Sequence, residues 1–173
     1  MSYIEPYIMA YGALALFVIV YLESFGMPLP GESALVASSL MALHGLMQID
    51  AVLIAVVTGA ILGDSTGYVI GRFGGRKLLE KHGHRVKLTP SRLAGFERQF
   101  EKNGFLVVAS ARFFVLLRQL NGIIAGSMKM RPTRFMAANI IGAIGWALVW
   151  GLGPYLLSGA LAPYVAPVKN WFG

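Results

Sequence analysis

Two long apolar runs stand out in a chain that otherwise alternates apolar stretches with short polar breaks. Residues 51–71 carry one charged side chain, Asp64, and residues 135–154 carry none. A helix needs about 20 predominantly apolar residues to cross the roughly 30 Å hydrocarbon core of a bilayer. The pattern therefore predicts two complete transmembrane helices, over residues 49–72 and 133–158.

A different pattern precedes the first predicted span, where two uncharged runs flank a break that contains two prolines. The break, residues 26–31, reads Gly-Met-Pro-Leu-Pro-Gly and lies between Glu23 and Glu32. Proline removes a backbone donor and clashes with the preceding turn, so one helix cannot continue through this break. The two arms either cross the membrane as two helices or form a re-entrant hairpin over residues 8–46, with both glutamates held inside the protein.

The second half of the chain repeats this pattern on a shorter scale around two arginines. Arg112 and Arg118 separate uncharged runs at residues 103–111 and 119–128, each well below the length of a membrane span. A re-entrant hairpin over residues 105–128 is therefore the better interpretation. The predicted fold is all-α: an inverted repeat of a hairpin followed by a transmembrane helix, in which the acidic tip of the first hairpin meets the basic tip of the second near the midplane.

Basic residues are distributed unevenly. Residues 1–71 contain no Lys or Arg, whereas residues 72–102 contain nine, against three acidic residues. Positive charge marks the cytoplasmic side of membrane proteins, so the net charge of +7 in a chain that is 56% hydrophobic indicates anionic lipid headgroups as partners rather than nucleic acid. We expect both chain ends to face outward and a second basic cluster to lie on the cytoplasmic side as well. It consists of Lys129, Arg131 and Arg134.

The basic cytoplasmic loop, residues 73–104, contains the signals of a short amphipathic helix. Thr89 and Pro90 have the form of an N-cap followed by proline at the first helical position, and Asn103-Gly104 is expected to end the helix. Its apolar face consists of Leu93, Phe96 and Phe100. A helix lying on the cytoplasmic leaflet and a soluble helix that covers the domain are both compatible with this pattern. Residues 159–173 are expected to form a C-terminal tail. The N-terminus lacks the positive region of a signal peptide, so we expect the first apolar stretch to be retained.

Five ionisable side chains lie at membrane depth in this pattern, although each costs about 2.5–3.5 kcal/mol at the centre of a membrane helix. They are Glu23, Glu32, Asp64, Arg112 and Arg118. Such residues usually serve function, and the alternative is a set of buried ion pairs that fix the hairpin geometry. The two arginines present planar forks of N–H donors that match phosphate oxygens. Gln119 and Asn121 add amide donors, either for the same phosphate or for the backbone freed at the hairpin break.

The three carboxylates are candidates for proton coupling or gating. Burial favours the protonated form of a carboxyl group and a neighbouring arginine favours the charged form, so ligand binding can switch such a group. On the first span, Asp64, Tyr68 and Arg72 recur every four residues and could line a polar path. An adjoining glycine stripe would allow close helix packing, within the chain or in a homo-oligomer. It consists of Gly59, Gly63, Gly67 and Gly71.

Motifs of enzymes and metal sites are missing from the sequence. Cysteine is absent, and His44, His82 and His84 lack the spacing of metal ligands. The sequence contains no nucleophile elbow, P-loop or His-Glu-x-x-His motif. We therefore predict no catalytic residue, no metal site and no organic cofactor.

Taken in order, the motifs resemble those of the DedA family of membrane proteins, also called SNARE-associated or VTT-domain proteins. The resemblance covers residues 8 to 155, approximately. It rests on Glu23 with Pro-Leu-Pro-Gly-Glu at 28–32, on Gly63-Asp64 with Tyr68 and Gly71-Arg72, and on Arg112-Phe113-Phe114 with Arg118, Ala125-Gly126 and Phe135.

This resemblance implies paired re-entrant hairpins, functional arginines and acidic residues linked to proton coupling. The supporting positions would be Pro28, Pro30, Gly31, Tyr68 and Arg72. It further implies a multi-pass lipid transporter of the bacterial cytoplasmic (inner) membrane, a flippase or scramblase for a phosphate-bearing lipid such as phosphatidylethanolamine or undecaprenyl phosphate. The alternatives are an enzyme that acts on a lipid phosphate, a transporter of ions or small solutes, and a membrane scaffold.

Overall fold

The computed structural model describes residues 5–75 and 90–157, and every regular element in these two stretches is helical. Short π-helical stretches, η1 (Gly71–Gly75) and η3 (Leu148–Leu152), extend two of the helices. The helices are α1 (Glu5–Ser24), α2 (Gly31–Leu43), α3 (Ile49–Ile70), α5 (Pro90–Ala111), α6 (Val115–Ser127) and α7 (Pro132–Ala147). Residues 76–89 of the predicted basic loop, which include Thr89, His82 and His84, and the predicted tail lie outside the described residues.

Two helices are long and apolar enough to cross a bilayer, as the sequence predicts. With its π-helical extension, α3 runs over Ile49–Gly75, and the helix of α7 continues over Pro132–Leu157. At 27 and 26 residues, each is about 40 Å long. The all-α class is therefore confirmed, and two helices of spanning length and composition lie where the sequence predicts them, whereas their crossing of a bilayer stays a prediction.

The remaining helices form two hairpins, α1–α2 and α5–α6, which turn at the predicted breaks. In the first turn, Gly26 has a φ of 114°, a conformation that residues with a side chain rarely adopt. The return arms α2 and α6 have 13 residues each. At about 20 Å they are too short to cross the hydrocarbon core alone. These lengths favour re-entrant hairpins, whereas their depth in a bilayer and the inverted repeat stay predictions.

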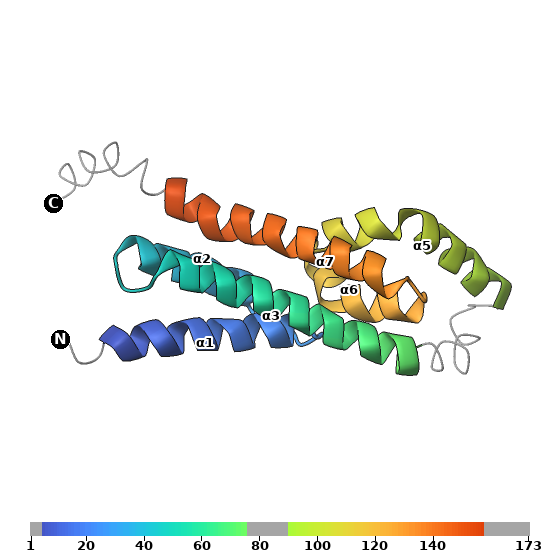
Figure 1. Cartoon of the computed structure of the whole chain (residues 1–173), viewed down its shortest axis with the longest axis horizontal. Coiled ribbons are helices and arrows are strands. Elements are labelled where there is room, and N and C mark those ends of the chain that lie inside the picture. The colour runs from blue at the N-terminus through green and yellow to red at the C-terminus, as the bar shows by residue number, and fades with distance from the viewer. Residues whose placement is uncertain (1–4, 76–89, 158–173) are drawn as a thin grey trace.

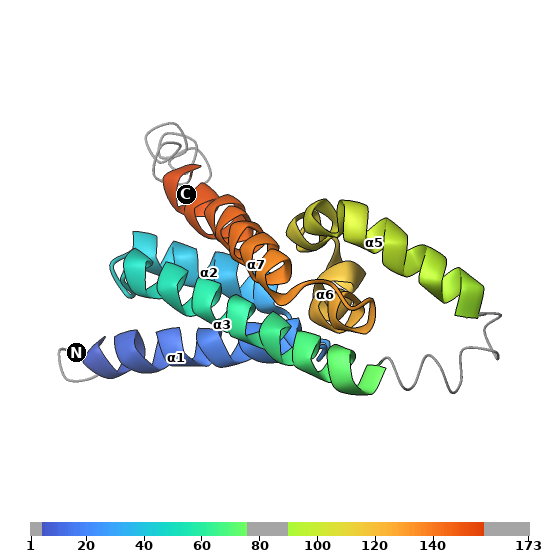
Figure 2. The same cartoon turned by 45° about the vertical axis from the view of Figure 1, so that its right-hand side comes forward.

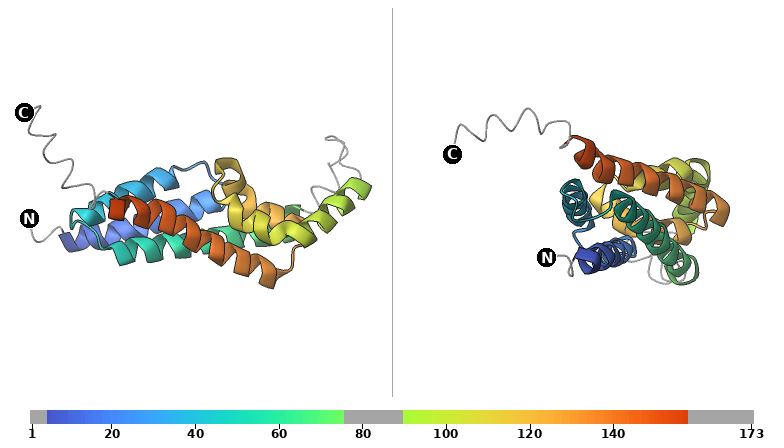
Figure 3. Two further views of the ribbon diagram at one scale, coloured as in Figure 1. Left: turned by 90° about the horizontal axis from the view of Figure 1, so that it is seen from above. Right: turned by 60° about the vertical axis from the view of Figure 1, so that its left-hand side comes forward.

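The hairpins lie at opposite ends of the molecule, alongside the long helices α3 and α7 (Figure 1). The start of α1 and the end of α7 lie at one end, and the end of α3 and the start of α5 lie at the other, as a perpendicular view also shows (Figure 3). The charge distribution predicts the same separation, because the segment that follows α3 is the basic one and the residues before it contain no Lys or Arg.

The predicted end of the amphipathic helix is wrong. α5 runs without a break from Pro90 through Asn103 and Gly104 to Ala111, so the predicted interfacial helix and the first arm of the second hairpin are one helix. Gly104 has a packing role, because a Cβ there would collide with the Phe100 ring. The first turns of α5 extend away from the other helices (Figure 2). The side chains of Arg92, Leu93 and Phe96 in these turns lie outside the described residues.

The glycine stripe of α3 fastens both hairpins to the same helix. Gly59 and Gly63 lie against the backbone of α1, and Gly67 and Gly71 lie against Ile123 of α6. The contact is reciprocal, because Gly122 and Gly126 of α6 lie against the backbone of α3 at Asp64 and Tyr68. Small residues at such crossings let backbones approach closely. The predicted packing role of the stripe is therefore confirmed.

Gly126→Ala should loosen the junction of α6 with α3, because the added Cβ would collide with the Tyr68 carbonyl oxygen and the Arg72 amide nitrogen. Overpacking of this kind costs about 1–3 kcal/mol. Thermal unfolding of the purified protein in one detergent measures the loss. Gly145→Ala is the control, because no atom lies within 4 Å of its Cβ position. Equal melting temperatures for Gly126→Ala and the native chain would show that this contact does not limit stability.

Candidate functional site

A layer of polar side chains separates two apolar clusters in the interior. One cluster joins α1 and α2 to the first half of α3, and the other joins α5 and α6 to its second half. Along α3, Asp64 lies between Ala60 of the first cluster and Tyr68 of the second. Asn139 takes the corresponding place in α7. Both polar side chains are fully buried, so they require partners within the protein.

Arg112, at the tip of the second hairpin, supplies the central charge of this layer and is 1% exposed. Its Nη2 lies 2.6 Å from Asp64 Oδ2, 2.7 Å from Asn139 Oδ1 and 3.1 Å from the Ala60 carbonyl oxygen. Asn121 Nδ2 donates to the same Asp64 oxygen at 3.2 Å. The guanidinium–carboxylate pair of Arg112 and Asp64 therefore joins four elements. They are both arms of the second hairpin, α3 and α7.

Arg118 links the second hairpin to the first. Its Nη2 lies 2.6 Å from Glu23 Oε1 and its Nη1 lies 3.0 Å from Glu32 Oε2. The guanidinium lies 5.2 Å from the centre of the Trp146 ring, a favourable cation–π distance. Glu23 Oε2 also lies beside Gly31, the first residue of α2, so the positive end of this helix helps to hold the carboxylate. The predicted meeting of an acidic and a basic hairpin tip is thus present in the structure.

Several polar atoms of this layer have no partner in the protein. Among the described residues, the buried side-chain atoms without a hydrogen bond are Arg112 Nε and Nη1, Arg118 Nε, Trp146 Nε1 and Asp64 Oδ1. Four of these five atoms are N–H donors. An unsatisfied buried polar group costs about 1–3 kcal/mol. An acceptor that entered the layer would therefore gain hydrogen bonds from donors that the protein leaves unused.

The turn of the first hairpin explains one of the predicted supporting residues. Gly31 lies directly against the Glu23 carboxylate, where a Cβ would collide with its oxygens. Pro28 and Pro30 are exposed in the turn, and Pro30 immediately precedes α2. These residues shape the tip that places Glu23 and Glu32.

Tyr68 and Arg72 lie along α3 beyond Asp64. The Tyr68 hydroxyl donates to the Met130 carbonyl oxygen, and Arg72 Nη1 donates to the same oxygen at 3.0 Å. They fasten the turn between α6 and α7, and the polar path stays a prediction. Gln119 is half-buried, and its side chain makes no hydrogen bond with the described residues. Its predicted phosphate contact is therefore untested.

Two residues of the layer were missed by the sequence analysis. Asn139 is the one residue with an amide side chain in the uncharged run 135–154, and that isolated polar position is the signal that could have found it. Trp146 is 1% exposed and packs in the core, and the sequence carries no sign that its ring lies beside Arg118.

Comparisons with known proteins identify similar membrane proteins. A family model described as the VTT domain matches residues 29–155. An uncharacterized membrane protein of Synechocystis is 37% identical over 139 residues, which cover 80% of this chain and 64% of that protein. The inner membrane protein YohD of Escherichia coli is 27% identical over 146 residues, 82% of this chain and 73% of its own. A Lactococcus lactis protein named alkaline phosphatase-like protein is 28% identical over 144 residues, 80% of this chain and 67% of its own.

The chain spans less than two thirds of the length of the Synechocystis relative. No solved structure matches the chain.

Removing one partner of the Arg112–Asp64 pair should cost more stability than removing both. Arg112→Gln leaves the Asp64 carboxylate without its counter-charge, and breaking a buried pair in this way typically costs about 3–5 kcal/mol. Arg112→Gln combined with Asp64→Asn removes both charges and should recover at least half of the loss. Thermal unfolding in one detergent compares the variants.

The control is Lys102→Gln at an exposed position, which should change stability by less than about 0.5 kcal/mol. A double variant no more stable than Arg112→Gln would contradict a stabilising ion pair between these residues.

Proposed function

Because the chain belongs to the VTT-domain family of membrane proteins, also called the DedA family, we propose that it moves a phosphate-bearing lipid across the bacterial cytoplasmic membrane. The phosphate would pass through the polar layer in which the two hairpin tips meet. The observation that carries this proposal is a pair of buried arginines, Arg112 and Arg118, whose N–H groups are only partly used by the protein.

The donors of this layer suit a phosphate. A guanidinium presents a planar fork that matches two phosphate oxygens, and it stays charged when buried. Three of the donors without a partner belong to Arg112 and Arg118. The side-chain amide of Asn121, which donates to Asp64, lies beside them. A lipid phosphate would take these donors and compete with the carboxylates for the arginines.

A groove along α2 supports a lateral route to Arg118. It has a volume of about 340 Å³ and is lined by one face of the helix, from Glu32 and Ser33 to Leu40. Glu32 is 33% exposed and lies at the end nearest the hairpin tip, where it pairs with Arg118. An acyl chain would lie along the apolar part of the groove while its headgroup reaches this pair.

The charges of the layer connect phosphate binding with protons. Two arginines face three carboxylates, those of Glu23, Glu32 and Asp64, so the fully ionised layer has a net charge of −1. A phosphate group adds at least one more negative charge. Burying uncompensated charge is unfavourable, so at least one carboxylate should take up a proton when the phosphate binds. This requirement supports the proposed proton coupling.

Action on a lipid phosphate as an enzyme is the second candidate, because the Lactococcus lactis relative is named alkaline phosphatase-like protein. Within residues 5–75 and 90–157, no three His, Cys, Asp or Glu side chains are placed to hold a metal ion. Phosphate released from labelled lipid would identify this activity in the transport assay. Ion flux without lipid movement would identify a solute transporter.

Lipid movement in proteoliposomes should depend on the Arg118–Glu23 pair. Arg118→Gln with Glu23→Gln removes one charge of each sign, so the net charge of the layer is kept while a phosphate ligand is lost. Hydrogen bonds to charged groups contribute about 1.5–3 kcal/mol, so we expect the rate to fall about tenfold or more. Labelled phosphatidylethanolamine, phosphatidylglycerol and undecaprenyl phosphate serve as probes, with diacylglycerol as the lipid without phosphate.

The matched control is Asp50→Asn with Lys102→Gln, which removes one charge of each sign at exposed positions. Unchanged movement in the Arg118→Gln, Glu23→Gln variant, or equal movement of diacylglycerol, would contradict the proposal.

Binding of a phosphate lipid should strengthen as the pH falls, because binding requires proton uptake. Glu32→Gln removes one negative charge from the layer and should bind the lipid more tightly than the native chain at about pH 8, with a weaker dependence between about pH 6 and 8. Equilibrium fluorescence of a labelled lipid with the protein in detergent measures both. If neither protein shows a pH dependence, proton coupling is wrong and phosphate recognition still stands.

A further inference from the structure

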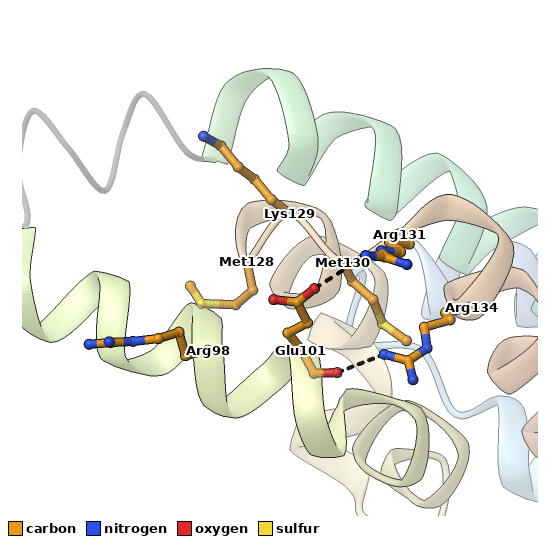
Figure 4. A pocket seen from close by; sticks show the side chains of 7 residues that line it. All are labelled: Arg98, Glu101, Met128, Lys129, Met130, Arg131 and Arg134. Carbon is orange, nitrogen blue, oxygen red and sulfur yellow. Dashed lines mark hydrogen bonds and ion pairs between the residues drawn. The ribbon is translucent and has the colours of Figure 1, made fainter.

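A second group of basic side chains lies outside the polar layer, at the end of the molecule where α3 ends and α5 begins. A pocket of about 570 Å³ opens between α5, the turn that joins α6 to α7, and the first turn of α7. Figure 4 shows that its cations come from these three segments, with Arg131 and Arg134 beside Glu101 and with the side chains of Arg98 and Lys129 extending away from it. The cations are Arg98, Lys129, Arg131 and Arg134, and the carboxylate is that of Glu101.

Glu101 organises the pocket without neutralising it. Its backbone carbonyl oxygen accepts a hydrogen bond from Arg134 Nη1 at 2.8 Å, and its carboxylate lies 3.6 Å from Arg131 Nη2. The Arg131–Glu101 pair is mostly exposed, at 73% and 62%, so it contributes little and an incoming anion can replace it. Four cations against one carboxylate leave a clear excess of positive charge.

The turn that presents Lys129 is held firmly. Lys129 has a φ of 57°, in the left-handed region that residues with a side chain seldom occupy. The next residue, Met130, is 5% exposed, and its carbonyl oxygen accepts hydrogen bonds from Tyr68 and Arg72. The cations of the turn are thus pre-positioned by α3.

The same contacts place the pocket at the edge of the apolar zone. Arg72 lies near the end of the apolar helix Ile49–Gly75, and Pro132 begins the second such helix immediately after the turn. A helix of this kind ends where the hydrocarbon core gives way to headgroups. If these two helices span the bilayer as predicted, the turn from Lys129 to Arg131 lies at headgroup level, on the side that the charge distribution predicts to be cytoplasmic.

We propose that this pocket is a second phosphate-binding site, which holds the headgroup of an anionic phospholipid of the cytoplasmic leaflet. Arg98, Lys129 and Arg131 would donate to the phosphate oxygens, and Met128 and Met130 would contact the adjoining glycerol and acyl carbons. The site is separate from the buried arginines and does not depend on transport. The negative charge of the lipid headgroup and the positive charge of the pocket would attract each other over about one Debye length, which is about 8 Å at physiological salt.

Lipid-dependent stabilisation of the full chain in detergent tests the proposal. The test protein and its variants all carry Arg118→Gln and Glu23→Gln, so binding at the polar layer is weakened equally in every protein compared. Phosphatidylglycerol and cardiolipin should raise the melting temperature and phosphatidylcholine should not. Arg98→Gln with Arg131→Gln should weaken the apparent affinity about tenfold or more, since each basic residue contributes to attraction of an anionic headgroup.

Lys102→Gln is the matched control for Arg98→Gln, because it removes one exposed basic side chain from the same helix outside the pocket. Arg98→Lys keeps the charge and should retain most of the binding, which separates charge loss from misfolding. Equal lipid affinity in the Arg98→Gln, Arg131→Gln variant and its parent would overturn the proposal. Equal protection by inorganic phosphate or glycerol phosphate at the same concentration would also overturn it, because the site would then bind a soluble anion.

Discussion

Arg112 and Arg118 keep their charge under any condition that a protein meets, so their burial requires carboxylates at the same depth. Asp64 reaches Arg112 from the middle of α3, and Glu23 reaches Arg118 from the first hairpin. This requirement fixes the relative position of the two hairpins, since any sliding along α3 would separate charge from counter-charge. The glycines of α3 permit the close backbone contacts at which the four side chains meet.

The same pairing limits how far the structure can be optimised for stability. Replacement of buried ion pairs by apolar residues of similar volume is often neutral or stabilising in proteins, and this layer in addition leaves arginine donors without partners. Under the proposal, a phosphate would replace a carboxylate at an arginine and a proton would neutralise a carboxylate. In the proposed function, these exchanges would release one hairpin tip from the other. The contacts of the hairpins with α3 involve backbone and small residues, so they would survive the exchange.

Hydropathy and proline positions predicted the parts of the fold that depend on local chain properties. The two spans follow from apolar length, and the hairpin turns follow from the prolines near Glu32 and the charges near Arg112. Partner choice could not be predicted, because sequence spacing gives the depth of Asp64 but not its rotation toward Arg112 rather than Arg118. Gly104 was predicted to end a helix, because glycine is common at helix ends. In the structure it lies inside a continuous α5, where the missing side chain makes room for the Phe100 ring. Both outcomes are decided by tertiary contacts.

The two arginine-containing regions differ in how fully carboxylates compensate their positive charges, and this difference bears on how a headgroup would move. The exposed pocket has an excess of cations and one weakly paired carboxylate, Glu101, so the proposed anion would bind there without a proton. Counted with the partly exposed Glu32, the polar layer has more carboxylates than arginines, so in the proposed function an anion would enter it together with a proton. Between them, Tyr68 and Arg72 follow Asp64 at four-residue intervals on α3, and both donate to the turn beside the pocket. In this scheme a proton is taken up when the lipid headgroup moves from headgroup level to the middle of the membrane. A proton gradient would therefore act on that step and not on the first encounter with the lipid.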